Sequence, residues 1–483
     1  MLDFIPPFPV RPSGPLPPYR LFQVAYRNLL EIWEEKAFEY RFFSTRILMQ
    51  TVHVCNSPAT VKYALLTGNA SFERKSPQMR HALEPLLGDG LFISDGKTWR
   101  SRRPAIAAVV HQSKIDLFAP IMVETASEMV ERWNKLRPGQ PVDVLTEMAH
   151  LTSEIISRTI FGRHLGALRA GEIVEGFSDY QRAVGQLDFM SLLGLPDWLP
   201  RLQRLSVKRS ARRILTVLEE TIRESSAETA GEEPSLLRLL AAASLETTGQ
   251  PLDANALRNE AATIFMAGHE TTANSLAWTW YLLSQAPDVE ARLHEEVDRV
   301  LQGGPPSLAV LPRLVYTRAI FEEALRLYPP VPILSRQAMR DEQIQNHQVK
   351  AGSLVLVAPW LLHRHKLFWE KPDHFVPERF LPENAAARDK FCYIPFAVGP
   401  RVCAGMAFAL TEAVLCLAAL AQRLALRLQP GTVVEPVARL TLRPRGGLPM
   451  TIHPRPAANG AASAGAGFPA EIRASEALPR AQR

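Results

Sequence analysis

A single cysteine in a glycine-bearing loop, just before an apolar helix, constrains this chain more than any other feature. Residues 391–405 read FCYIPFAVGPRVCAG, and MAFALTEAVLCLAALAQRLAL follows directly. The apolar run predicts a buried helix, which places Cys403 at a helix N-terminus. Backbone N–H groups and the positive end of the helix dipole favour a thiolate there. The stretch therefore predicts a ligand for a soft metal, whereas a lone cysteine is usually only a small buried residue.

The spacing around Cys403 decides between these two interpretations. It follows the pattern F-x-x-G-x-R-x-C-x-G, formed by Phe396, Gly399, Arg401, Cys403 and Gly405. This pattern resembles the haem-binding loop of the cytochrome P450 family. The resemblance implies haem b (iron protoporphyrin IX) held by the Cys403 thiolate, a ligation that haem iron accepts. Phe396 would then limit solvent access to the sulfur, and the glycines would let the backbone approach a flat cofactor.

Composition excludes several other classes of protein. The chain has 483 residues, 47% hydrophobic and 22% charged, as a globular protein has. Its four cysteines form no C-x-x-C pair, which argues against a disulfide scaffold or a zinc site. The net charge of +6 is modest and no compact Lys/Arg run occurs, so we expect no nucleic-acid partner.

The two ends of the chain differ in composition from the rest. Residues 1–20 form a proline-rich arm with no continuous apolar run, so we expect neither a signal peptide nor a membrane anchor, and a cytoplasmic protein. Residues 455–483 are rich in Ala and Gly and are predicted to be disordered. Between them, 21–454 is predicted to form one catalytic domain. The resemblance covers 30–453 and implies a mainly α fold with a smaller β-rich part, the triangular-prism fold, and we expect a monomer without a fused reductase.

Sequence patterns also predict individual elements. The longest helix begins after Asp253, a good N-cap, and ends near Ser284 before Pro287. An amphipathic helix is predicted over 22–40, and the segments 331–360 and 426–453 contain strand-like runs. The regions near 76–92 and 183–200 are candidate lids over a substrate pocket.

A second motif is Glu323-Ala-Leu-Arg326, followed by two prolines. Glu and Arg three residues apart share a helix face and can pair, and most such pairs are solvated salt bridges of little energetic weight. The motif also resembles the buried charge cluster of the family, whose third member would be Arg379. The resemblance implies that Glu323, Arg326 and Arg379 lock the segment that positions Cys403 and take no part in catalysis.

A third motif, Ala267-Gly268-His269-Glu270-Thr271-Thr272, lies in the middle of the longest predicted helix. Read alone it could be a kink, because Gly weakens a helix and Thr can bond back to a carbonyl. It resembles the oxygen-activation segment of the family. The resemblance implies that Ala267 and Gly268 adjoin the haem and that Gly268 makes room for dioxygen. Glu270 and Thr271 would then deliver protons as an acid–alcohol pair.

The two haem carboxylates need cationic or N–H donors. Trp99 and Arg103, together with Arg336 and Arg401, match the family positions of the propionate anchors. His363 is expected to be structural, and His269 is not expected to bind iron.

Together these motifs imply a haem-thiolate monooxygenase that inserts one oxygen atom into a C–H bond of a lipophilic small molecule, such as a fatty acid or a terpenoid. Electrons from NAD(P)H would arrive through a ferredoxin or flavodoxin and its reductase, steered by Lys97, Arg100 and Arg102. The alternatives are a haem-thiolate peroxygenase or isomerase, and a non-catalytic haem protein that binds a gas.

Overall fold

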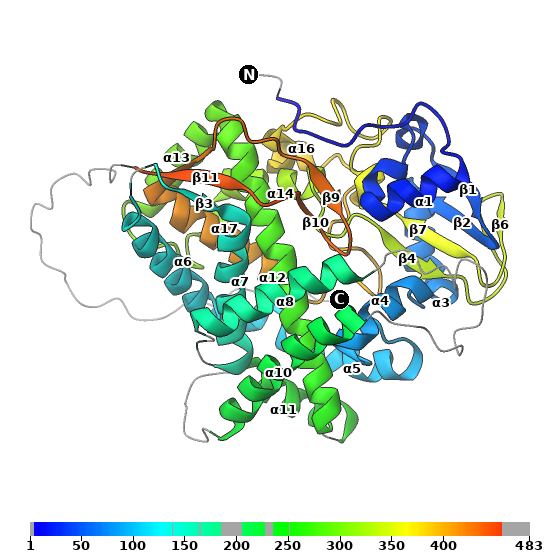
Figure 1. Cartoon of the computed structure of the whole chain (residues 1–483), viewed down its shortest axis with the longest axis horizontal. Helices are drawn as coiled ribbons and strands as arrows, with labels where there is room; N and C mark the ends of the chain where they lie inside the picture. Colours follow the sequence, from blue (N-terminus) through cyan, green and yellow to red (C-terminus); the bar gives the residue numbers. More distant parts are fainter. Residues whose placement is uncertain are drawn as a thin grey trace, which may run out of the picture.

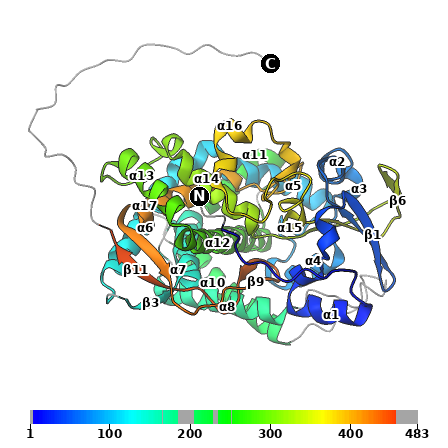
Figure 2. The ribbon, with the colours of Figure 1, turned by 90° about the horizontal axis from the view of Figure 1, so that it is seen from above.

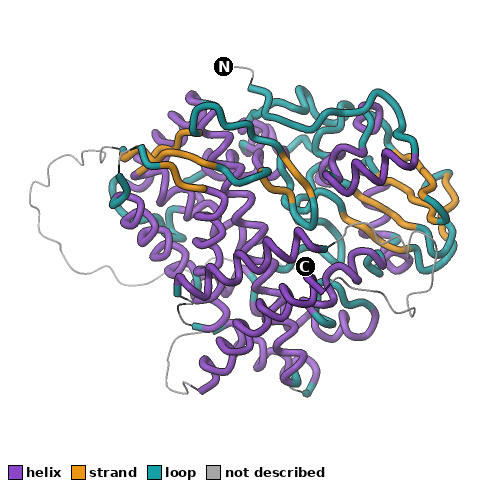
Figure 3. Tube along the Cα trace, viewed as in Figure 1, coloured by secondary structure: helices purple, strands orange, loops and turns teal. Residues whose placement is uncertain are grey.

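The molecule is built mainly from helices, with its strands gathered along the upper and right-hand side (Figure 1, Figure 3). The computed structural model describes residues 4–137, 139–162, 164, 166–184, 205–227, 235–250 and 252–455. The predicted fold class, mainly α with a smaller β-rich part, is confirmed. The predicted tail beyond Arg455 and most of the candidate lid 183–200 lie outside the described residues.

Helix α12 (Ala254–Gln285) runs through the middle of the molecule (Figure 2). Its start is fixed by Asp253, whose carboxylate accepts a hydrogen bond from the Ala256 amide at 2.7 Å. Most of its side chains are buried against α7 (Val144–Phe161), α14 (Val315–Leu327) and α17 (Met406–Arg423). The helix predicted from Asp253 is therefore confirmed, and it carries the third motif into the core.

Helix α17 directly follows the Cys403 loop, as predicted from its apolar sequence. It packs against α6 (Ala119–Asn134), α13 (Pro287–Leu301) and α14. Among the described residues, α17 is the one helix long and apolar enough to cross a membrane, and most of it is buried inside the protein. The buried contacts agree with the prediction of a core helix.

The other helices are α1 (Pro18–Arg27), α2 (Pro58–Lys62), α3 (Asn69–Phe72), α4 (Pro77–Leu87), α5 (Gly96–Val109), α8 (Ala167–Ala183), α10 (Leu205–Ala227), α11 (Leu236–Thr248), α15 (Pro359–Leu362) and α16 (Pro382–Ala385). Shorter helical turns are η1 (Leu29–Ile32), η2 (Glu35–Phe38), η3 (Tyr63–Thr67), η4 (Gln112–Leu117), η5 (Leu311–Arg313), η6 (Pro377–Phe380) and η7 (Lys390–Cys392).

The largest sheet has the strand order β1-β2-β7-β4, formed by β1 (Phe42–Ile47), β2 (Gln50–Cys55), β7 (Leu354–Val357) and β4 (Leu334–Gln337). Strands β2 and β7 are parallel, and β4 pairs antiparallel to β7 with Arg336 opposite Val355. A second sheet joins β3 (Pro141–Asp143), β11 (Pro449–Pro454) and β8 (Leu424–Leu428), while β5 (Glu342–Ile344) pairs with β6 (His347–Val349) and β9 (Pro436–Ala438) with β10 (Leu442–Pro444). The predicted strands in 331–360 and 426–453 are confirmed.

The helix predicted over 22–40 is wrong beyond Arg27. Helix α1 ends there, and the buried Asn28 takes an extended conformation. The Asn28 side chain accepts from the Leu30 and Ala438 amides and donates to the Pro436 carbonyl. A long-range contact with β9 therefore replaces the helical hydrogen bonds, and only short turns follow.

Glu323 and Arg326 form a salt bridge in which both side chains are fully buried, at 2.6 Å. Arg326 also donates to the carbonyls of His363, Pro372 and His374. Such a pair is tolerated inside a protein only when its hydrogen-bonding capacity is filled in this way.

The other members of this charge cluster tie α14 to the segment before the Cys403 loop. Glu323 accepts from the Val376 amide and lies 3.5 Å from Nε of Arg379. His363, which the sequence analysis expected to be structural, accepts from the Ile394 amide through Nε2 at 2.9 Å. The structure therefore brings together the three charged residues predicted to brace Cys403.

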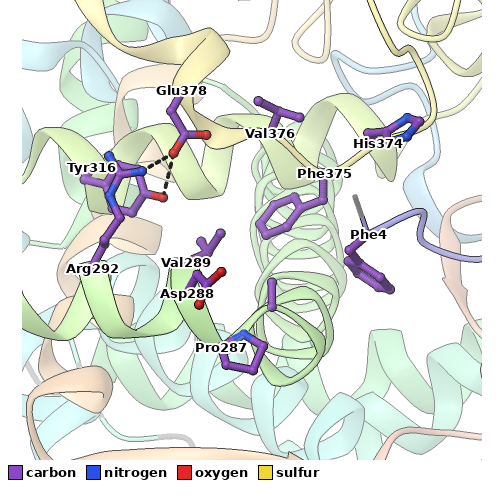
Figure 4. A pocket seen from close by; sticks show the side chains of 11 residues that line it. Phe4, Pro287, Asp288, Val289, Arg292, Tyr316, His374, Phe375, Val376 and Glu378 are labelled. Atoms are coloured by element: carbon purple, nitrogen blue, oxygen red, sulfur yellow. Dashed lines mark hydrogen bonds and ion pairs between the residues drawn. The ribbon is translucent and has the colours of Figure 1, made fainter. Parts of the chain in front are cut away.

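The N-terminal arm lies over the same segment. The Phe4 carbonyl accepts from the Phe375 amide, and Arg11 pairs with Asp373 at 2.5 Å. A cavity of about 250 Å³ separates Phe4 and Phe375 from the start of α13, and Glu378 joins Arg292 and Tyr316 on its far wall (Figure 4). The segment 372–378 is thus held on one side by Arg326 and on the other by the arm.

We predict that Arg326→Met lowers the free energy of unfolding by about 3–5 kcal/mol, because it leaves the Glu323 carboxylate buried without its partner. Urea unfolding followed by tryptophan fluorescence measures this change. The matched control is Arg445→Met, which removes an ion pair with Glu435 that is about 40% exposed on both sides and should cost less than about 1 kcal/mol. Equal losses in the two variants would contradict the bracing role.

Candidate functional site

The Cys403 loop is a set of tight turns closed by its own backbone. The Cys403 amide donates to the Phe396 carbonyl at 2.9 Å, and the Val402 amide donates to Gly399. Gly399 has a φ of +78°, and a Cβ atom there would lie 1.9 Å from the Leu65 carbonyl oxygen. A residue without a side chain is therefore required at this position.

Two opposing influences act on the Cys403 thiol. Burial by the surrounding protein raises its pKa, while the Gly405 amide and the charge of Arg103 lower it. Burial has the larger effect, so the pKa of the Cys403 thiol lies above its usual value. A bound metal cation would supply the missing charge, because coordination deprotonates a thiol.

The Cys403 thiol differs from the other cysteines in its exposure. Cys55, Cys392 and Cys416 are buried, whereas Cys403 is accessible. Ala267 is likewise exposed in the otherwise buried middle of α12, and α12 packs against α17, the helix that follows the Cys403 loop. The loop and the middle of α12 therefore each carry an accessible residue.

A group of cations lies beside this loop. Arg336 is almost fully buried on β4, Arg401 belongs to the loop, and Lys75 precedes α4. Burial, followed by repulsion from Arg336 and Arg401, lowers the pKa of Lys75. Burial also brings the pKa of Arg336 to about 9, with a smaller contribution from Arg401, and that of Arg401 to about 10, with a smaller contribution from Arg103. Glu73 and Asp95 offset this repulsion only at Arg401.

Nε of Arg336 and Nε of Arg401 have no hydrogen-bond partner within the described part of the chain. Buried cations that repel one another and retain free donors fit a bound group carrying two carboxylates. Lys75 is a residue that the sequence analysis missed. A single lysine in SFERKS carries no local signal, and only the pairing of Lys75 with Arg336 across a β-bridge reveals it.

The two predicted anchors on α5 also meet the Cys403 loop. The guanidinium of Arg401 lies 4.6 Å from the ring centroid of Trp99, and Arg103 donates to the Val402 carbonyl at 2.7 Å. The structure thus brings Trp99, Arg103, Arg336 and Arg401 together. By contrast, Arg102 points away into ion pairs with Asp89 and Glu260 and is not available to steer a partner.

The α12 motif presents its residues in different directions. The Thr271 hydroxyl donates to the Ala267 carbonyl at 2.7 Å, so its oxygen can still accept a hydrogen bond. A Cβ atom on Gly268 would lie 2.8 Å from Ile156, so the close approach of α7 favours a residue without a side chain at this position.

His269 is buried between the rings of Phe177 and Phe265. Glu270 makes no hydrogen bond to Thr271 among the described residues. Its carboxylate accepts instead from Gln181, Asn274 and Thr441. The sequence analysis missed all three, and Gln181 and Thr441 lie far from Glu270 along the chain, whereas Asn274 is one turn further along α12.

Comparison with known proteins agrees with this site. The sequence pattern of the family described as Cytochrome P450 matches residues 13–450. The chain belongs to the cytochrome P450 family. Members bind haem through a cysteine thiolate, so the accessible Cys403 and the unpaired donors of Arg336 and Arg401 fit the cofactor of the family.

Individual relatives are similar over most of their length. Cyclooctatin synthase of Streptomyces melanosporofaciens is 32% identical over 85% of this chain and 88% of its own. Cyclooctat-9-en-7-ol 5-monooxygenase of the same organism is 32% identical over 77% and 79%. The crystal structure of the heme domain of cytochrome P450DA superposes with a TM-score of 0.75 at 27% identity, covering 92% of this chain and 94% of that one. The protein is accordingly a cytochrome P450 monooxygenase with the cytochrome P450 fold.

We predict that Arg336→Met speeds the loss of haem to excess apomyoglobin by tenfold or more, since a hydrogen bond to a charged group contributes about 1.5–3 kcal/mol. The measurement is the rate of haem transfer followed by absorbance. The control, Lys350→Met, removes an exposed cation paired with Asp341 and should leave the rate unchanged. An unchanged rate in Arg336→Met would contradict the role of the cation group as a carboxylate site.

Proposed function

We propose that the protein hydroxylates a C–H bond of a lipophilic small molecule, with Cys403 as the haem ligand and with Glu270 and Thr271 as the groups that deliver protons. The observation that carries this proposal is that the Cys403 thiol and Ala267 on α12 are both accessible, and that a buried acid, Glu270, and an alcohol, Thr271, follow Ala267 by about one helical turn. When bound, haem supplies one-electron and dioxygen chemistry at the cysteine-ligated iron.

The residues of the chain would contribute in three ways. Cys403 would hold the iron, and the rigid turns between Phe396 and Cys403 would hold the sulfur in place. Lys75, Arg336 and Arg401 would orient the cofactor through its carboxylates, with Arg103 near the thiol. Thr271 would accept and donate a proton at its hydroxyl, because its one bond to Ala267 leaves the oxygen lone pairs free.

The substrate class is suggested by the relatives. The name of one relative specifies the oxidation of cyclooctat-9-en-7-ol, and that of another, carotene epsilon-monooxygenase of Arabidopsis thaliana, specifies carotene. The latter is 30% identical over 83% of this chain. We propose a terpenoid hydrocarbon or its alcohol as the substrate. The acid–alcohol pair favours this function over a peroxygenase, an isomerase or a gas-binding protein, because none of these needs proton delivery to dioxygen.

We further propose that electrons come from NAD(P)H through a separate ferredoxin or flavodoxin in the cytoplasm. Lys97 and Arg100 are exposed on α5, the helix that carries Trp99 and Arg103 to the Cys403 loop. Of the two, Arg100 is partly engaged by Glu73 at 3.3 Å. An acidic partner that docks there would approach the cofactor from the cysteine side.

The first test of this proposal is a spectroscopic titration. We predict that cyclooctat-9-en-7-ol or a related terpenoid shifts the ferric protein from low to high spin, whereas dodecanoic acid does not. Reconstitution with a ferredoxin, its reductase and NADPH should then give a monohydroxylated product by mass spectrometry. Hydroxylation of dodecanoic acid alone would contradict the substrate class, and a product formed without dioxygen would contradict the reaction.

The second test addresses Thr271. We predict that Thr271→Val diverts consumed NADPH from product to hydrogen peroxide and lowers product formation on the order of 10²-fold, the lower range for a positioned proton donor. The matched control is Thr279→Val, because Thr279 donates to the Ser275 carbonyl on the same helix with the same 2.7 Å geometry. Comparable loss of product in both variants would assign Thr271 a purely structural role.

A further inference from the structure

The Glu270 carboxylate is held very unevenly. Its Oε1 atom accepts three hydrogen bonds: from Gln181 at 2.8 Å, from Asn274 at 3.0 Å and from Thr441 at 2.8 Å. Its Oε2 atom accepts none among the described residues and lies 3.8 Å from Nε2 of His269. All five of these side chains are largely buried.

The three donors come from three different parts of the fold. Asn274 is on α12 itself, one turn after Glu270, and Thr441 directly precedes β10. Gln181 is on the last turn of α8 and has no exposed surface. The Gln181 side-chain oxygen lies 3.3 Å from the Thr441 hydroxyl, as a longer alternative acceptor for the single proton that Thr441 donates to Glu270, and the Gln181 backbone carbonyl accepts from Arg439 at 3.3 Å. The Gln181 amide therefore links the end of α8 to α12, in addition to the ring contact of Phe177 with His269.

We propose that Gln181 is a positioning residue: it ties the end of α8 to Glu270, saturates Oε1 and leaves Oε2 as the oxygen that takes up and releases a proton. This inference rests on the proposed role of Glu270 in proton delivery. A proton on Oε1 would compete with three donors, whereas a proton on Oε2 displaces none of them. Any movement of α8 that withdraws Gln181 makes the two carboxylate oxygens of Glu270 more alike and changes the proton route.

The charged groups around Glu270 do not orient its carboxylate, and the neutral donors do. His269 on α12 has a pKa lowered by burial, so its ring is neutral near pH 7. Arg443 on β10 interacts with Glu270 through its charge alone, and it is repelled by Arg439 and by Arg182 on α8. No cation donates a hydrogen bond to Glu270 among the described residues. The orientation of the carboxylate thus depends on Gln181, Asn274 and Thr441.

The test uses Gln181→Met, which keeps the side-chain volume but removes the donor, in the haem-loaded full chain. We expect amide hydrogen exchange at residues 178–184 to become about tenfold faster or more, because a hydrogen bond to a charged group is lost. We also expect a larger solvent isotope effect on substrate-free NADPH consumption with a ferredoxin and its reductase. Gln181→Glu, which sets a second carboxylate against Glu270, should increase both effects.

The matched control is Asn274→Leu, which removes one donor to the same oxygen without touching α8. Exchange at 178–184 should remain at the value of the unaltered protein, whereas the isotope effect should rise as in Gln181→Met, because Oε1 loses one of its three donors. Unchanged exchange in Gln181→Met would overturn the attachment of α8. Faster exchange with an unchanged isotope effect would overturn the assignment of Oε2. If Glu270→Gln also left the isotope effect unchanged, the proposed role of Glu270 would fail, while the exchange result would still decide the attachment.

Discussion

The buried pair of Glu323 and Arg326 is the interaction on which the rest of the site depends. Two charges without solvent exposure are stable only because each is surrounded by partners, and the partners of Arg326 are three backbone carbonyls between 363 and 374. The pair therefore fixes the position of the irregular segment 363–374 and contributes little net stability. That irregular chain, held from the other side by the N-terminal arm through Arg11 and Asp373, leads directly into the Cys403 loop.

Beside the Cys403 loop, the protein without its cofactor has several charged and polar groups that lack partners. Lys75, Arg336 and Arg401 repel one another, two of their donor nitrogens have no partner within the described residues, and the nearby thiol has a raised pKa. A cofactor with a metal cation and two carboxylates would offset all three features. The metal cation would stabilise the thiolate of Cys403, and the carboxylates would reduce the repulsion among the cations and accept hydrogen bonds from their free donors. The same groups that destabilise the protein alone would thus become binding energy for haem, which makes folding and cofactor retention linked properties.

The features that sequence analysis predicted are those encoded by local spacing. The Cys403 loop, the i,i+3 pair of Glu323 and Arg326, and the cap of α12 at Asp253 each occupy one short segment. The features that it missed depend on distant segments. Helix α1 stops at Asn28 because of a contact with Pro436, 408 residues away, and Lys75 and Gln181 gain their roles only from β4 and α12. Gly268 shows a third case: the motif was recognised, but the close approach of Ile156 on α7, which also favours a glycine, was not.

The central claim is that the accessible thiol in the braced loop is the iron ligand. The absorption spectrum of the reduced, carbon-monoxide-bound protein tests it most directly, compared between the unaltered chain, Cys403→Ser and Cys392→Ser. We expect the long-wavelength band of thiolate-ligated haem in the unaltered chain and in Cys392→Ser, and its complete loss in Cys403→Ser. Persistence of that band in Cys403→Ser, or its loss in Cys392→Ser, would contradict the account.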